Sequence, residues 1–87
     1  MKKILISEMH FEGISMNLRY YLTLDGNKVG VEIRDDSGNM AACVVPDTPE
    51  RVLDFLYILA ECGVMIGHLR DVTEDYIHEH FLTDTVT

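Results

Sequence analysis

Basic residues are scarce in this sequence: 7 Lys and Arg stand against 15 Asp and Glu, which gives a formal net charge of -8. A protein that binds nucleic acid must neutralise phosphates with basic side chains, so the composition disfavours a nucleic-acid partner. The shortage is greatest over residues 47–87, where 9 acidic residues meet only 2 basic ones. Such an acidic field repels anionic membranes and favours basic protein surfaces or cations.

Long hydrophobic runs are also missing. A membrane-spanning helix needs about 18 apolar residues, and Asp54 interrupts the best candidate, residues 52–60. The apolar residues 4–6 follow two lysines as in a secretion signal, but Ser7-Glu8 end the run short of the roughly 7 residues required. We therefore expect a soluble protein with no membrane partner.

Cysteine is too sparse for a disulfide framework or a zinc ribbon. The only two, Cys43 and Cys62, stand far apart and form no C-x-x-C pair. We expect both to be small buried hydrophobic residues, with a disulfide between them as the alternative. This usage is typical of the reducing cytoplasm, where we expect the protein to be located.

Catalytic signatures are absent too. The sequence has no G-x-S-x-G motif, no G-x-x-x-x-G-K loop and no glycine cluster that opens a helix after a strand. A chain of 87 residues builds one domain with a thin core, in which a water-excluding pocket is hard to form. We expect no enzyme activity, no cofactor and no metal ligands.

Alternating apolar and polar residues dominate the first half. The even positions from 14 to 24 are apolar and most odd ones are polar, which predicts a half-buried strand. Asp25-Gly26-Asn27 suits a tight turn into a second strand over 28–34. Residues 3–11 and 40–45 are predicted to add two more strands. The inward face of 3–11 stays open because residues 4–6 are all apolar.

The second half has a helical period. Thr48 and Pro49 are typical of a helix start, and the predicted helix over 48–62 ends at Gly63. Its polar stripe is narrow, so two leucines are expected to be almost fully buried, Leu56 and Leu59.

A second helix is predicted over 67–81. Its apolar face consists of Leu69, Val72, Tyr76 and Ile77. Asp71 and Glu74 have the spacing of a capping box, which would move the helix start about one turn later. We prefer the longer helix.

Strands followed by helices are typical of the α+β class. We predict an antiparallel β-meander of three to four strands, followed by an antiparallel pair of α-helices packed on one sheet face. Residues 1–82 are expected to form this single domain. Residues 83–87 show no periodicity and are expected to be a frayed C-terminal tail.

The most distinctive string of the chain is His68-Leu69-Arg70-Asp71-Val72-Thr73-Glu74-Asp75-Tyr76. Together with the preceding Tyr20-x-Leu22 strand and the helix over 52–59, it makes residues 16–78 resemble a family of small Firmicutes proteins, mostly clostridial, that form a domain of unknown function. That family often has proline two positions before the histidine, where this chain has Ile66. The resemblance implies a cytoplasmic bacterial protein and supplies no activity.

Four polar residues of the second predicted helix are spaced i, i+3, i+4 and i+7 and therefore share one side: Asp71, Glu74, Asp75 and His78. We call this set the acidic face. It lies opposite the apolar residues, as the solvated face of an amphipathic helix does. Carboxylates and an imidazole at this spacing also suit a divalent cation, but helix-borne metal sites point inward and draw ligands from several helices.

His80 and His68 are expected to have structural roles. Within a helix, His78 and His80 project in different directions and cannot share one ion, whereas at a frayed helix end they could. We expect His80 to be partly buried and hydrogen-bonded, and His68 to fix the turn before the helix.

These observations favour a small non-enzymatic cytoplasmic module for protein interaction or regulation, with the acidic face as its partner-binding surface. The alternative is a metal-binding or metal-sensing protein that uses the same face. A third hypothesis is that the partner is a second copy of the chain, bound through a sheet edge or through a methionine-rich patch of Met9, Met16, Met40 and Met65.

Overall fold

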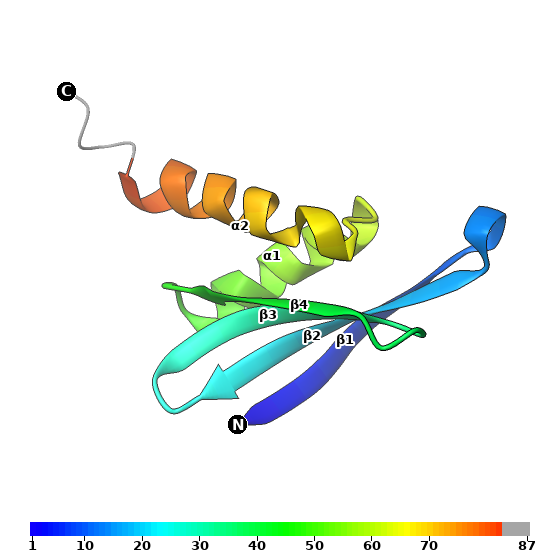
Figure 1. The fold of residues 1–87 in the computed structure, drawn as a ribbon. Coiled ribbons are helices and arrows are strands. Elements are labelled where there is room, and N and C mark those ends of the chain that lie inside the picture. Colours follow the sequence, from blue (N-terminus) through cyan, green and yellow to red (C-terminus); the bar gives the residue numbers. More distant parts are fainter. Residues whose placement is uncertain (83–87) are drawn as a thin grey trace.

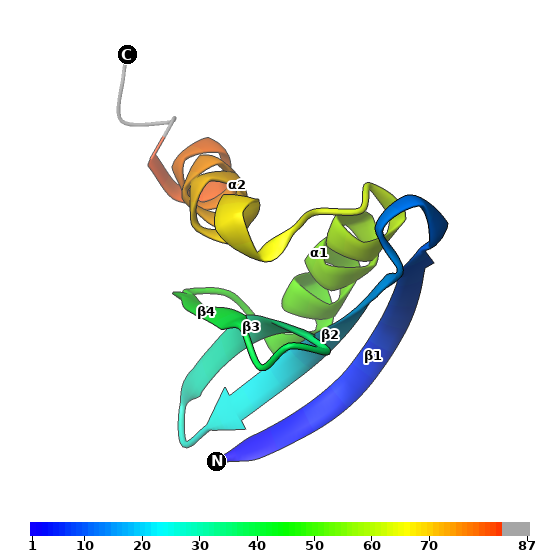
Figure 2. The ribbon, with the colours of Figure 1, turned by 45° about the vertical axis from the view of Figure 1, so that its right-hand side comes forward.

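Four antiparallel strands form one sheet in sequence order: β1 (Lys2–Phe11), β2 (Met16–Asp25), β3 (Lys28–Asp35) and β4 (Met40–Val45). Two helices follow and pack on one face of the sheet (Figures 1 and 2): α1 (Pro49–Glu61) and α2 (Leu69–Ile77). The structure, a computed structural model, describes residues 1–82, and the predicted tail over 83–87 lies outside them. The predicted α+β meander with a helix pair is confirmed.

β2 begins two residues later than the alternation predicts. Ile14 lies in a short 3-10 turn, Glu12–Ile14, and its side chain is exposed. Ser15 follows with a φ of 46°, a left-handed conformation that reverses the chain before Met16. The prediction that Ile14 belongs to the strand is therefore wrong, because the turn removes it from the ladder.

A β-bulge settles the face of β1 that the sequence leaves open. Leu5 pairs with Tyr21, but Ser7 already pairs with Tyr20, so Ile6 is an extra residue in the ladder. The bulge shifts the alternation by one position. Apolar side chains at the even position 4 and at the odd positions 9 and 11 consequently share the inner face and pack against the core.

The core lies between the inner sheet face and the helices. α1 contacts β1, β2 and β3, whereas α2 contacts β4. Leu56 and Leu59 are both 0% exposed, as predicted from the helical period. The other large, fully buried hydrophobic side chains come from β2, β3, β4 and both helices: Leu18, Tyr20, Val31, Ile33, Val45, Val52 and Leu69.

The ends of α1 match the predicted signals. The Thr48 hydroxyl accepts a hydrogen bond from the backbone N–H of Arg51 at 3.4 Å, Pro49 is the first helical residue, and Gly63 adopts a φ of 66° after the last turn. The ring of Phe11 lies next to Gly63, with ring atoms 3.3 Å from the position that a Cβ on Gly63 would take, so the helix end contacts β1.

The second helical segment covers the longer predicted range. A 3-10 turn over Ile66–His68 leads into α2, and a π-helical turn over His78–Leu82 continues it. Asp71 lies inside the first turn of α2, so the alternative start at a capping box is wrong. Within residues 1–82, no helix is both long and apolar enough to cross a membrane.

Both cysteines are free thiols. Cys43 is half-buried on β4, and Cys62 is exposed, which corrects the prediction that both are buried. The reason is positional: Cys62 is the C-cap residue of α1, beyond the turns that press against the sheet.

Candidate functional site

The acidic face lies where the helical spacing places it. Asp71, Glu74, Asp75 and His78 are all exposed, while Leu69 and Thr73 point into the core from the opposite side of α2. Glu74 pairs with Arg70 at 3.1 Å, and both side chains are well exposed. Exposed pairs of this kind contribute at most about 0.5 kcal/mol, so this contact leaves the face free to bind.

The acidic face is not assembled as a metal site. Among the residues that the structure describes, no three His, Cys, Asp or Glu side chains lie close enough together to hold one metal ion. The four residues point outward from a single helix, whereas helix-borne metal sites converge from several helices.

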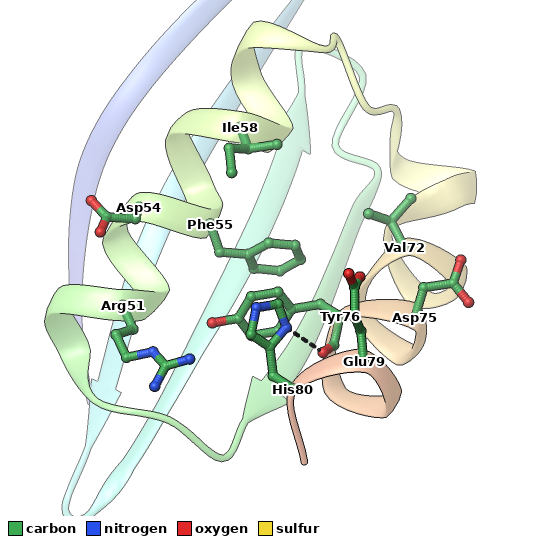
Figure 3. A pocket seen from close by; sticks show the side chains of 9 residues that line it. All are labelled: Arg51, Asp54, Phe55, Ile58, Val72, Asp75, Tyr76, Glu79 and His80. Carbon is green, nitrogen blue, oxygen red and sulfur yellow. Dashed lines mark hydrogen bonds between the residues drawn. The ribbon is translucent and has the colours of Figure 1, made fainter. Parts of the chain in front are cut away.

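A groove of about 440 Å³ separates α1 from α2 and the π-helical turn that follows it (Figure 3). One wall comes from α1, with Asp54 and Ile58, and the other from α2, with Val72 and Asp75. Asp75 therefore belongs both to the acidic face and to the rim of this groove. The remaining lining residues are Arg51, Phe55, Tyr76, Glu79 and His80.

Three neighbouring rings, two of them stacked, form the base and one end of the groove (Figure 3). The rings of Phe55 and Tyr76 are stacked with centroids 4.3 Å apart, and the ring of His80 lies 4.2 Å from that of Tyr76. His80 Nδ1 also lies 2.9 Å from the carbonyl oxygen of Tyr76. Aromatic pairs contribute about 0.5–1.5 kcal/mol each beyond burial, which favours this arrangement of the rings.

His80 and His68 differ from expectation in part. His80 is hydrogen-bonded, as predicted, but it is exposed and not partly buried, because it lies past the end of α2 on the π-helical turn. His68 is exposed, and its side chain does not cap α2, so the predicted role in fixing the turn is not observed.

A buried carboxylate contacts two of the residues that line the groove. Asp47 immediately precedes the N-cap of α1, and its side chain is only 5% exposed. It accepts hydrogen bonds from the Tyr76 hydroxyl at 2.8 Å and the Thr48 backbone N–H at 2.8 Å, and Arg51 Nε lies 3.2 Å away. Asp47 thus ties the start of α1 to α2 through Tyr76.

The Asp47 network shifts the pKa values of both partners. Burial alone would raise the pKa of Asp47, but hydrogen bonds from Thr48 and Tyr76 and the positive charges of Arg51 and His80 together outweigh it and lower the pKa below its usual range. Burial raises the pKa of Tyr76, and donation to the Asp47 carboxylate raises it further. The Tyr76 hydroxyl therefore stays protonated as a donor.

Of the residues that line the groove, the sequence predicts only Asp75 as part of a binding surface. The helical spacing identified Asp75, but Tyr76 was assigned only to the apolar face of its helix. Nothing in the linear sequence pairs Asp47 with Tyr76, which lies 29 positions later. The available signal was an acidic residue directly before a helix N-cap, a position from which a carboxylate can reach a neighbouring element.

The methionines do not form a shared surface patch. Met9, Met16 and Met65 are partly buried against the core, whereas Met40 is exposed at the other face of the sheet.

Comparison with known proteins adds no relative: the chain matches no family model, and neither the curated proteins nor the solved structures give a significant match.

Proposed function

We propose that this chain is a small protein-interaction module that binds a basic, amphipathic helical segment of another protein in the groove between α1 and α2. The observation that carries the proposal is the composition of the groove, which combines an apolar, aromatic base with carboxylates at both rims. Helix-in-groove recognition uses the same combination, in which the apolar base accepts anchor side chains and the rim selects the charge of the partner.

The apolar part of the groove supplies contact area. Ile58 is exposed on the α1 wall, and Val72 and Tyr76 are only partly covered on the α2 side. Phe55 is buried beneath them and supports Tyr76 through the ring stack. A partner side chain that covers this surface removes apolar area from water at about 25 cal/mol per Å².

The charged part of the groove selects a basic partner. Asp54 stands on one wall, and Asp75 and Glu79 stand on the other. The cationic guanidinium of Arg51 is already paired with Asp47. The acidic face continues the negative surface along α2, so a basic segment is attracted over a longer distance than the groove itself.

We assign the module no catalytic role and place it in the cytoplasm. The polar groups in and beside the groove already hold the fold, since Asp47 binds Tyr76 and Arg51, and His80 contacts the Tyr76 carbonyl. The exposed free thiol of Cys62 suits a reducing compartment.

A fluorescent peptide probe tests the proposal directly. The chain contains no tryptophan, so a synthetic helical peptide with lysines on its polar face and leucines plus one tryptophan on its apolar face reports binding through its own emission. We expect this peptide to bind and to dissociate as salt is added. A peptide with glutamates in place of the lysines should not bind.

Matched variants locate the binding site. Asp54→Asn with Asp75→Asn removes two groove carboxylates and should weaken binding about tenfold, because partly exposed charge contacts contribute up to about 1 kcal/mol each. Glu12→Gln with Glu61→Gln makes the same change in net charge at exposed positions outside the groove and should leave affinity nearly unchanged. Equal weakening by both pairs, or equal binding of the two peptides, would contradict the proposal.

A further inference from the structure

The outer face of the sheet, on the side away from the helices, has the features of an interface. We define it by the side chains that alternate with the core residues along the strands, chiefly Lys3, Leu5, Tyr21, Glu32, Arg34 and Val44. The register places Leu5 beside Tyr21, and Tyr21 in turn beside Glu32. Apolar and charged side chains are therefore mixed across the middle of this face.

Apolar side chains occupy both edges of the outer face. Leu5 on β1 and Val44 on β4 are 52% and 60% exposed, and Met40 on β4 is exposed as well. An antiparallel sheet with one solvated face normally carries polar residues there, in alternation with the core residues. A surface that covers these side chains would remove their apolar area from water.

A buried carboxylate lies in the middle of the same face. Glu32 is only 2% exposed, although both helices lie on the other side of the sheet. Lys3 Nζ lies 3.2 Å from Glu32 Oε2, and Arg34 Nε pairs with the same oxygen. Because Glu32 is already desolvated and paired in the single chain, covering it leaves no unpaired charge.

The outer face has no net charge, unlike the rest of the molecule. Its third basic residue, Arg19, pairs with Glu8 at 3.0 Å and with Asp36 at 3.2 Å. The bases Lys3, Arg19 and Arg34 thus balance Glu8, Glu32 and, in the turn after β3, Asp36, while Asp25 and Lys28 face each other in the register of β2 and β3 and balance as well. Two chains of charge -8 repel each other through their acidic helices, but their outer faces can meet without repulsion.

We propose that a second copy of this chain packs on the outer face, sheet against sheet, in a two-fold symmetric dimer. Such a contact uses the same surface on both copies and turns the acidic helices away from each other. Strands of 10, 10, 8 and 6 residues, at about 3.3 Å per residue and about 4.8 Å between strands, give a face of roughly 500 Å². Two such faces bury roughly 1,000 Å², near the lower limit for a specific interface, so the dimer dissociates on dilution.

Sedimentation of the full chain over a range of concentrations tests this dimer. The wild-type mass should rise from 9.9 kDa toward twice that value as concentration increases. Leu5→Lys with Val44→Lys places charges on the outer face and should hold the chain at 9.9 kDa throughout. Both positions are exposed in the single chain, so the circular dichroism spectrum should not change.

A matched control on α1 distinguishes the outer face from the groove. Tyr57→Lys with Ile58→Lys adds lysines at positions that are 52% and 55% exposed. This variant should dimerise as the wild type does. It should bind the peptide probe more weakly, because Ile58 lines the groove. The outer-face variant should bind the probe normally. A wild type that stays monomeric, an outer-face variant that still dimerises, or a control that loses the dimer would overturn the proposal.

Discussion

Thr73 is a polar residue in an apolar setting. It is 2% exposed on the core side of α2, and its hydroxyl has no hydrogen-bond partner among the residues that the structure describes. A buried hydroxyl without a partner costs about 1–3 kcal/mol, whereas valine has nearly the same shape and a similar helix propensity. We expect Thr73→Val to raise the free energy of unfolding by about 1 kcal/mol, measured by urea denaturation.

Thr73→Ser is the matched control for this substitution. It keeps the hydroxyl and removes one methyl group, so it should lower the free energy of unfolding by about 1 kcal/mol. A Thr73→Val protein less stable than the wild type would show that the hydroxyl has a partner after all.

Asp47 makes stability depend on acidic pH. Its pKa is lowered in the folded chain from an unfolded value of about 3.9. The stabilisation is therefore complete above the unfolded pKa and is lost as the pH falls through the folded pKa. Asp47→Asn should lower the free energy of unfolding by about 1–2 kcal/mol at neutral pH, since a charge-assisted hydrogen bond is lost.

The pH profile separates this effect from a general loss of packing. Below about pH 4 the unfolding curves of the wild type and Asp47→Asn should converge, because protonation removes the same charge from the wild type. A difference that stays constant down to pH 2 would mean that the carboxylate charge plays no part in the effect.

At the scale of elements, β3 has a position where a side chain does not fit between its neighbouring strands. A Cβ on Gly30 would lie 2.5 Å from the carbonyl oxygen of Cys43 on β4 and 2.8 Å from the Thr23 hydroxyl on β2. Gly30→Ala must therefore displace the β4 backbone and should lower the free energy of unfolding by about 1–3 kcal/mol. Gly13→Ala, in open space, should have little effect when both are measured by thermal unfolding.

The elements differ in how well the sequence predicts them. The ends of α1 depend on local chemistry at Thr48, Pro49 and Gly63, so they are readable from the chain. The face of β1 depends on a bulge set by the register with β2, and the alternation in the sequence cannot show where an extra residue is inserted. The late start of β2 likewise depends on Ser15, which adopts a backbone conformation that most residue types avoid.

For the candidate site, the sequence does not predict how the two helices are placed relative to each other. Helical spacing fixes which residues share the acidic face, and all four are exposed as it predicts. The groove arises from the separation of α1 and α2, which depends on α1 contacting β1, β2 and β3 while α2 contacts β4. No sequence pattern within either helix predicts that separation, so the stacking of the Phe55 and Tyr76 rings can be identified only in the folded chain.

At the scale of the whole molecule, charge is divided between the two sides of the sheet. Of the eight net negative charges, seven belong to residues 47–87, which include both helices, whereas the outer face of the sheet is balanced. This division gives each proposed contact its own surface: the acidic helices suit a basic partner, and the balanced sheet face suits a second copy.

The division of charge predicts how the acidic face affects stability. Replacing Asp71, Glu74, Asp75 and His78 together by Asn, Gln, Asn and Gln removes an exposed pair with Arg70 and a favourable charge in the first turn of α2. It also removes repulsion among the carboxylates. These terms are each a few tenths of a kcal/mol and oppose one another, so the free energy of unfolding should change by less than about 1 kcal/mol.

Salt distinguishes these opposing terms. Added salt screens repulsion among exposed charges, so the wild type should gain stability between low and high ionic strength, and the fourfold variant should gain less. Chemical denaturation followed by circular dichroism at both ionic strengths measures the two gains.

If the variant instead loses several kcal/mol, the acidic face packs against other parts of the chain and is not available to a partner. If its stability holds, the same variant should bind the lysine peptide more weakly than the wild type, because Asp75 belongs to both the acidic face and the groove.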